Sequence, residues 1–139
     1  MFKLMDIFTV SIDVNINYKR KGDIMEDLKR QVLHIKETIE KGLTFDDCGI
    51  DAEEHGREST DIISGFDYLE DILDINYIVN GKGEYLGARV LVAFGGPNIW
   101  VDTQRKRIEG YWWQDKFFSH YDNDEMDLDG ALEELWACR

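Results

Sequence analysis

The chain has 139 residues, with 29 Asp and Glu against 16 Lys and Arg, and a formal net charge of −13 at pH 7. Its 43% hydrophobic and 12% aromatic residues exclude a disordered acidic tail, and its length suits one domain, residues 1–139. The net charge argues against direct binding of nucleic acid, because a polyanion would be repelled.

The negative charge is unevenly placed along the chain. Residues 43–74 carry eleven carboxylates and one base, and residues 115–139 carry eight carboxylates and two bases. Residues 1–42 and 75–114 each carry slightly more bases than acids. Such blocks predict an asymmetric electrostatic field with strongly negative regions, which would attract a basic partner.

The N-terminal sequence MFKLMDIFTV contains an early acid and no long apolar run. We therefore expect neither a signal peptide nor a transmembrane helix there. Cys48 and Cys138 are expected to be free thiols in a reducing compartment, which predicts a cytoplasmic location and no membrane partner.

The first predicted element is a strand over 10–18, where Val, Ile and Tyr alternate with polar residues at a period of two. A turn follows, and Asp23 is expected to cap a helix that ends near Gly42. Its apolar residues recur every three to four positions, so the helix should cover a sheet.

Residues 43–60 are expected to form an acidic loop, which can include a short helical turn, because they lack periodicity and contain two glycines. Ser59 or Thr60 could cap a short helix after the loop. Residues 68–74 stay undecided between helix and strand, since a short apolar run does not determine its own period.

Two hairpins are predicted next. Asn80-Gly81 suits a tight turn within 75–94, and Gln104, Arg105 and Lys106 separate two β-rich runs within 98–113. Residues 128–136 have the spacing of a terminal amphipathic helix. We therefore predict an α+β fold: an antiparallel sheet of about five strands, including 10–18, with an N-terminal and a C-terminal helix packed on it.

No metal or cofactor is expected. The three histidines are scattered without zinc-ligand spacing. The run from Glu125 to Gly130 resembles the first half of a calcium loop, but the twelfth place holds Trp136 instead of a carboxylate. An acidic start to the terminal helix is the simpler interpretation.

No catalytic motif is found either. GGPNIW lacks the lysine of a phosphate-binding loop. Asp102, Glu109 and Asp115 could be paired as catalytic carboxylates, but no partner His or substrate-shaped motif accompanies them. We therefore expect no enzyme activity.

The sequence YWW over 111–113 places aromatic side chains on both faces of a strand. One interpretation is that helices and aromatics close the two faces. The other is that Trp112 and Trp113 anchor a protein partner, since Trp and Tyr are enriched in interface hot spots.

The acidic blocks also have two interpretations: that they only keep the protein soluble, or that their carboxylates imitate the phosphates of nucleic acid. In the second, two rows of side chains contact a basic nucleic-acid-binding protein. The members are Asp46, Asp47, Asp51, Glu53, Glu54 and Glu58 in one row, and Asp122, Asp124, Glu125, Asp127 and Asp129 in the other.

A small, acidic, aromatic-rich domain without a catalytic motif is similar in overall character to phage and mobile-element proteins that block host defence. These include anti-CRISPR and anti-restriction inhibitors that occupy a nuclease's nucleic-acid channel. The resemblance implies a stoichiometric inhibitor that acts as a DNA mimic and carries over no residue roles.

Two alternatives remain open. An immunity or antitoxin protein that neutralises a basic toxin nuclease needs the same acidic surface. A small enzyme or ligand-binding module would instead have a pocket between sheet and helix near Tyr77, Trp100 and Trp112, and its acidity would be incidental.

Overall fold

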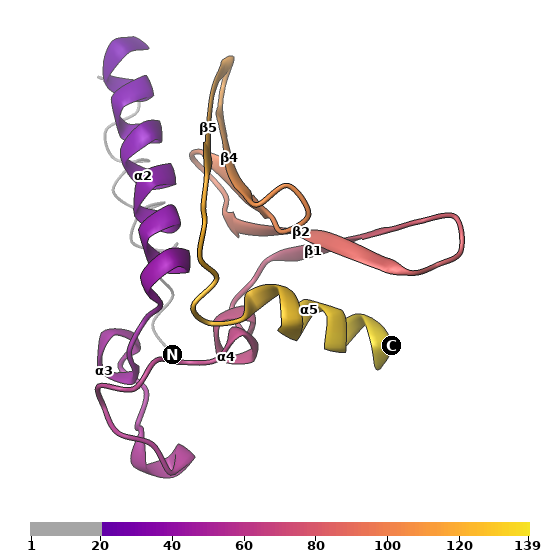
Figure 1. Ribbon diagram of the computed structural model, residues 1–139. Coiled ribbons are helices and arrows are strands. Elements are labelled where there is room, and N and C mark those ends of the chain that lie inside the picture. The colour runs from indigo at the N-terminus through magenta and orange to yellow at the C-terminus, as the bar shows by residue number, and fades with distance from the viewer. Residues whose placement is uncertain (1–20) are drawn as a thin grey trace.

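A computed structural model describes residues 21–139 of the chain (Figure 1). The predicted strand over 10–18 lies outside these residues. The helices are α2 (Lys21–Lys41), α3 (Phe45–Cys48), the 3-10 helix η2 (Glu53–His55), α4 (Gly65–Leu69) and α5 (Leu128–Ala137). The strands are β1 (Asp74–Val79), β2 (Tyr85–Ala93), β3 (Asn98–Asp102), β4 (Arg107–Trp112) and β5 (Asp115–His120).

The five strands form one antiparallel meander in the order β1-β2-β3-β4-β5. The predicted α+β fold, with a five-stranded sheet and a helix before and after it, is confirmed. The fifth described strand is β5, which pairs with β4 from Arg107↔His120 to Trp112↔Asp115. The sequence analysis did not predict β5.

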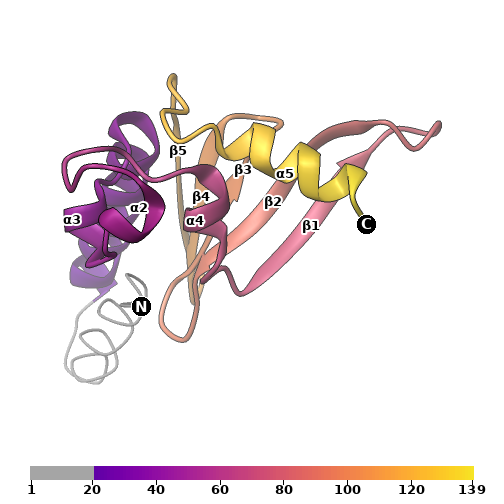
Figure 2. The ribbon, with the colours of Figure 1, turned by 90° about the horizontal axis from the view of Figure 1, so that it is seen from below.

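Helices cover one face of the sheet. The helix α2 packs on β4 and β5, and α5 packs on β2 and α4. Figure 2 shows α5 crossing in front of the strands while α2 lies beside β5. Alternate strand residues, among them Val90, Val101 and Ile108, point into the core beneath these helices.

The helix α2 buries one apolar face. Ile24, Leu28, Val32, Ile35 and Ile39 are all buried, as predicted from their spacing. The expected cap was wrong, because the helix has already begun by Lys21 and Asp23 lies within its first turn.

The close approach of α2 to the sheet depends on Gly110 in β4. A Cβ atom on this residue would lie 2.5 Å from Cγ2 of Val32 and 2.9 Å from Cδ1 of Leu28. Contacts this short force neighbours to move, so a side chain at this position would push α2 away from the strand.

The structure corrects one predicted turn and one predicted helix cap, and it settles the undecided segment 68–74. The β1–β2 connection is a five-residue loop, in which the Asn80 side chain accepts hydrogen bonds from the backbone N–H groups of Lys82 and Glu84. The positive φ, 79°, falls at Gly83. Ser64, and neither Ser59 nor Thr60, caps the short helix. Residues 68–74 contain the end of α4 and the first residue of β1.

Candidate functional site

The first acidic row lies on a closed loop, residues 43–61, which we call the acidic lobe. Its ends are joined by an isolated antiparallel bridge between Thr44 and Ile62. Thr44 and Asp47 form a capping box at the start of α3, each side chain accepting the other residue's backbone N–H at 3.0 Å. Phe45 is buried, which fixes α3 to the body of the protein.

The second half of the acidic lobe is held by Asp61. Its Oδ2 accepts the backbone N–H of Glu58 at 2.9 Å and pairs with Nε of Arg57 at 3.2 Å. Arg57 is the only base in residues 43–74, so this ion pair neutralises the only positive charge of the segment. The predicted loop is therefore built from two short helical turns closed by side-chain hydrogen bonds.

Two carboxylates of this frame have altered acidity. The backbone N–H and the hydroxyl of Thr44 hold the pKa of Asp47 below its usual value. The pKa of Asp61 is lowered by the backbone N–H of Glu58 first and by Arg57 second. Asp47 and Asp61 therefore remain charged at neutral pH while they stabilise the turns.

Other carboxylates of the acidic lobe face solvent. Asp51 also has a local role, since its Oδ1 accepts the backbone N–H of Glu53 at 3.0 Å. Within the described residues, four exposed carboxylate side chains of the lobe form no hydrogen bond or ion pair, and these are Asp46, Glu53, Glu54 and Glu58. Their negative charge is available to a partner.

The second acidic row serves mainly to start α5. Asp124 accepts the backbone N–H groups of Leu128 and Asp129 at 2.8 and 2.9 Å, and Asp127 is the N-cap and accepts the N–H of Gly130. Asp129 accepts a 2.6 Å hydrogen bond from the Tyr85 hydroxyl of β2. The predicted acidic helix start is confirmed.

The two acidic segments approach each other at the C-terminal end of α2. The backbone N–H of Glu125 donates to the carbonyl of Ile39 at 3.1 Å, and the N–H of Asp122 donates to the Glu40 carboxylate at 3.0 Å. Asp122 and Glu125 are exposed there. Their side chains therefore extend the acidic surface of the lobe beyond residue 61.

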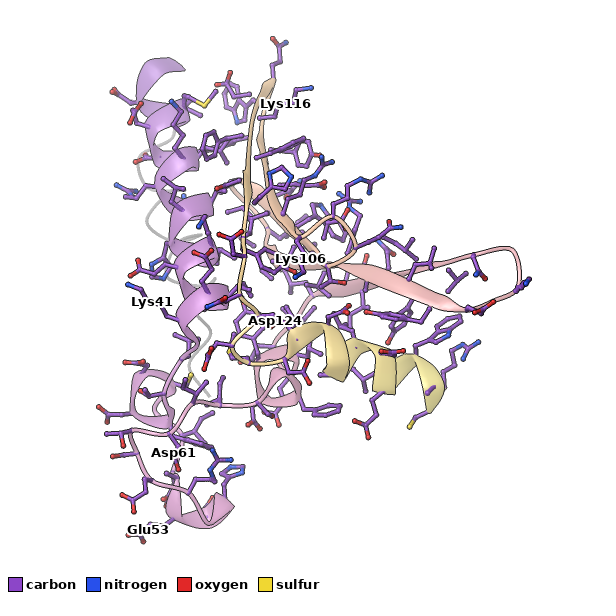
Figure 3. All side chains as sticks on the ribbon, in the orientation of Figure 1. Lys41, Glu53, Asp61, Lys106, Lys116 and Asp124 are labelled. Carbon is purple, nitrogen blue, oxygen red and sulfur yellow. The ribbon has the colours of Figure 1, made fainter. Side chains whose placement is uncertain are left out.

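Figure 3 shows the position of this surface in the molecule. The labelled Glu53 and Asp61 lie beyond the Lys41 end of α2, and Asp124 lies between them and the sheet. Lys116, at the start of β5, lies at the opposite end of the molecule. The acidic lobe is therefore far from the tip of the β4–β5 hairpin.

The two predicted aromatic anchors have different environments. Trp112 is 1% exposed and belongs to the core, so it cannot contact a partner, and that expectation was wrong. Trp113 is 76% exposed in the β4–β5 turn, where its φ is 57°. Because this turn lies beside Lys116, Trp113 and the acidic lobe are at opposite ends of the molecule.

The pocket imagined for a ligand-binding module does not form. Trp100 is in register with Glu109, so it lies on the face of β3 opposite to the one that carries Trp112 on β4. Tyr77 is on the covered face, where its ring lies 5.2 Å from that of Trp136. The three aromatic residues therefore line no common cavity.

Sequence analysis missed a cluster on the uncovered face of the sheet. Glu109 is buried and accepts hydrogen bonds from Arg89 at 2.8 Å and Arg107 at 2.7 Å. The alternation of Arg107 and Glu109 along β4 was visible in the sequence. The pairing with Arg89, two strands away, was not, because it depends on the sheet register.

In residues 21–139, no three His, Cys, Asp or Glu side chains are grouped as a metal site, and no helix is long and apolar enough to cross a membrane. Comparisons with protein-family models, with curated proteins and with solved structures find no match.

Proposed function

We propose that the protein is a stoichiometric inhibitor whose acidic lobe occupies the basic nucleic-acid-binding cleft of a defence nuclease, in the manner of an anti-CRISPR or anti-restriction DNA mimic. The observation that carries the proposal is the arrangement of the lobe. Four uncommitted carboxylates project from a loop closed by the Thr44–Asp47 capping box and by Asp61.

The electrostatic argument depends on charge density. Duplex DNA carries roughly one negative charge per 1.7 Å of its axis, and a cleft built for it presents Lys and Arg at matching density. The acidic lobe presents carboxylates without a base to offset them, because Arg57 is already paired. A carboxylate surface of this kind binds the cleft and offers no strand to cleave.

The order of the lobe also favours tight binding. A flexible acidic tail loses conformational entropy when it is fixed on a partner, and this loss reduces its affinity. Here the turns of α3 and η2 are already fixed by hydrogen bonds and by the buried Phe45. Binding therefore loses little conformational entropy from the loop.

The test is capture of the partner from a lysate of the host with tagged protein, at low and high salt, followed by mass spectrometry. We expect recovery of a nucleic-acid enzyme at low salt and its release by added DNA or by high salt. Recovery of proteins that DNA does not displace would contradict the proposal.

A charge-reversed variant and a matched control make the test specific. Glu53→Lys/Glu54→Lys changes two exposed carboxylates that hold no local contact, and Glu133→Lys/Glu134→Lys makes the same charge change on the exposed side of α5. We expect the first variant to lose at least about tenfold in affinity for the captured enzyme and the control to bind almost as wild type.

A further inference from the structure

The two edges of the sheet differ in how they are protected. The edge strand β5 packs against α2 and carries Asp115, Lys116 and His120. No described element pairs with the outer side of β1, and Figure 2 shows this strand at the margin of the sheet. Its sequence, DINYIV, contains one charge and neither Pro nor Lys. We call residues 73–79 the β1 edge. It lacks the features that usually prevent strands of two molecules from pairing.

The backbone groups of the β1 edge alternate between β2 and the outside. The N–H of Leu73 donates to the carbonyl of Leu91 in β2 at 3.3 Å, and the register with β2 is regular from residue 74 to residue 78. In an antiparallel pair, every second residue turns its backbone groups toward the same neighbour. The residues between them therefore turn their N–H and C=O groups outward, and these are Asp74, Asn76 and Ile78. Another extended chain can pair with all of these groups at once.

The side chains on the covered face of the β1 edge form one apolar row. Ile75 and Tyr77 lie opposite buried residues of β2. Leu73 precedes them and Val79 follows them at the same period of two, so all four point to the same face. Leu73 is 50% exposed and Val79 is 39% exposed. Both ends of the row are therefore open to solvent.

We propose that the β1 edge pairs with the β1 edge of a second copy of this chain, antiparallel and with Asn76 on the two-fold axis. The outward backbone groups of Asn76 then bond to those of the other Asn76. Leu73 lies opposite Val79 of the second copy, so the two exposed ends of the row cover each other. Ile75 lies opposite Tyr77 in the same row. The ten strands of the two copies form one continuous sheet.

The ends of the apolar row select this register. A slip by one residue would place apolar side chains on opposite faces of the sheet. A slip by two residues places either Leu73 opposite Gly81 or Val79 opposite Asp71. Only the register centred on Asn76 gives both exposed residues an apolar neighbour. The row is thus complementary to itself, which favours a second copy over an unrelated strand.

The distribution of charge permits the contact between two acidic molecules. Within residues 72–80, Asp74 is the only charged side chain, and in the proposed register it lies opposite Ile78. The helix α3 of the acidic lobe and the strand β1 lie on opposite sides of the molecule in both ribbon views (Figures 1 and 2). The lobes of the dimer therefore point away from each other. Their repulsion is screened at about 0.15 M salt, where the Debye length is about 8 Å.

The experiment measures self-association by sedimentation velocity over a range of protein and salt concentrations. We expect an equilibrium between monomer and dimer without larger species, because a two-fold contact closes on itself. The dimer fraction should stay equal or rise with salt, since backbone hydrogen bonds and apolar contacts need no opposite charges and screening reduces repulsion. A protein that stays monomeric, or a dimer that salt dissociates, would overturn the proposal.

A variant and a matched control locate the contact. Asn76→Lys places like charges opposite each other on the two-fold axis, so we expect the association constant to fall at least about tenfold. Asn98→Lys makes the same change of net charge, from −13 to −12, at an exposed position of β3 that has a strand on each side. This control should associate as wild type. Equal losses in the two variants would overturn the proposal, and circular dichroism shows whether each is folded.

Mixing two variants tests the register. Asn76→Asp should also associate weakly by itself, whereas its mixture with Asn76→Lys should form dimers, because opposite charges then meet at position 76. A mixture that stays monomeric would overturn the proposal. Loss of the captured enzyme from Asn76→Lys, without any self-association of wild type, would assign the β1 edge to that enzyme and also overturn it. The proposal is independent of the proposed function, since it requires no nuclease.

Discussion

At the scale of single residues, position on the sheet decides the role of neighbours in the sequence. Trp112 points into the core and is 1% exposed, whereas the next residue, Trp113, is 76% exposed in a turn. The φ of 57° at Trp113 is a conformation that bulky side chains rarely adopt and that glycine adopts without strain. The exposed ring is therefore kept at a cost in stability.

The substitution Trp113→Gly tests this cost. We expect the free energy of unfolding to rise by about 1 kcal/mol, because the left-handed conformation is no longer strained and little buried contact is lost. Chemical denaturation measures the change. Binding of the captured enzyme should be unaffected, since the acidic lobe lies at the other end of the molecule. A loss of stability would mean that the exposed ring packs on the protein.

At the scale of elements, the acidic lobe behaves as a unit closed by carboxylates. Asp47 caps α3, and Asp61 joins the backbone of Glu58 to the side chain of Arg57. Both carboxylates have lowered pKa values in the folded state. Their stabilisation is therefore present above the ordinary aspartate pKa of about 3.9 and is lost as the pH falls through the lowered values.

This predicts that the acidic lobe opens in acid before the sheet does. Below about pH 4, the NMR amide signals of Asp47 and Glu58 should move toward unfolded shifts while those of Val90 and Val101 stay in place. The variant Asp47→Asn keeps a side-chain acceptor for the Thr44 N–H but has no titratable group at this position. The part of the acid transition that depends on protonation of residue 47 should therefore disappear. Amide signals of the lobe that stay unchanged in acid would contradict this account.

The sequence predicted elements where a strong local pattern exists. The stripe from Ile24 to Ile39 placed α2, and the turn around Gln104 to Lys106 placed the β3–β4 hairpin. The strand β5 was missed because Trp113-Gln114 lacks the Asn and Gly typical of hairpin turns. In the candidate site, the exposure of the lobe carboxylates could be predicted from their charge. The hydrogen bonds of Asp124 at the start of α5 and the burial of Glu109 could not, because they depend on tertiary contacts.

At the scale of the whole molecule, exposed negative charge is concentrated at one end. The acidic lobe and residues 122–129 meet at one end of α2, while the side of the sheet away from the helices carries both arginines and carboxylates, among them Arg89, Arg107 and Glu109. An acidic end of this kind directs long-range attraction toward a basic partner and should orient the encounter. Occupation of the partner's nucleic-acid cleft by the acidic lobe is the central claim.

The measurement that tests this claim most directly is displacement of a fluorescent oligonucleotide from the captured enzyme, followed by anisotropy. We predict that added protein lowers the anisotropy to that of the free oligonucleotide at one equivalent, that Glu53→Lys/Glu54→Lys fails to do so, and that Glu133→Lys/Glu134→Lys succeeds. Anisotropy that stays high or rises while the protein binds would show a complex with the oligonucleotide still in place, and would contradict binding in the cleft.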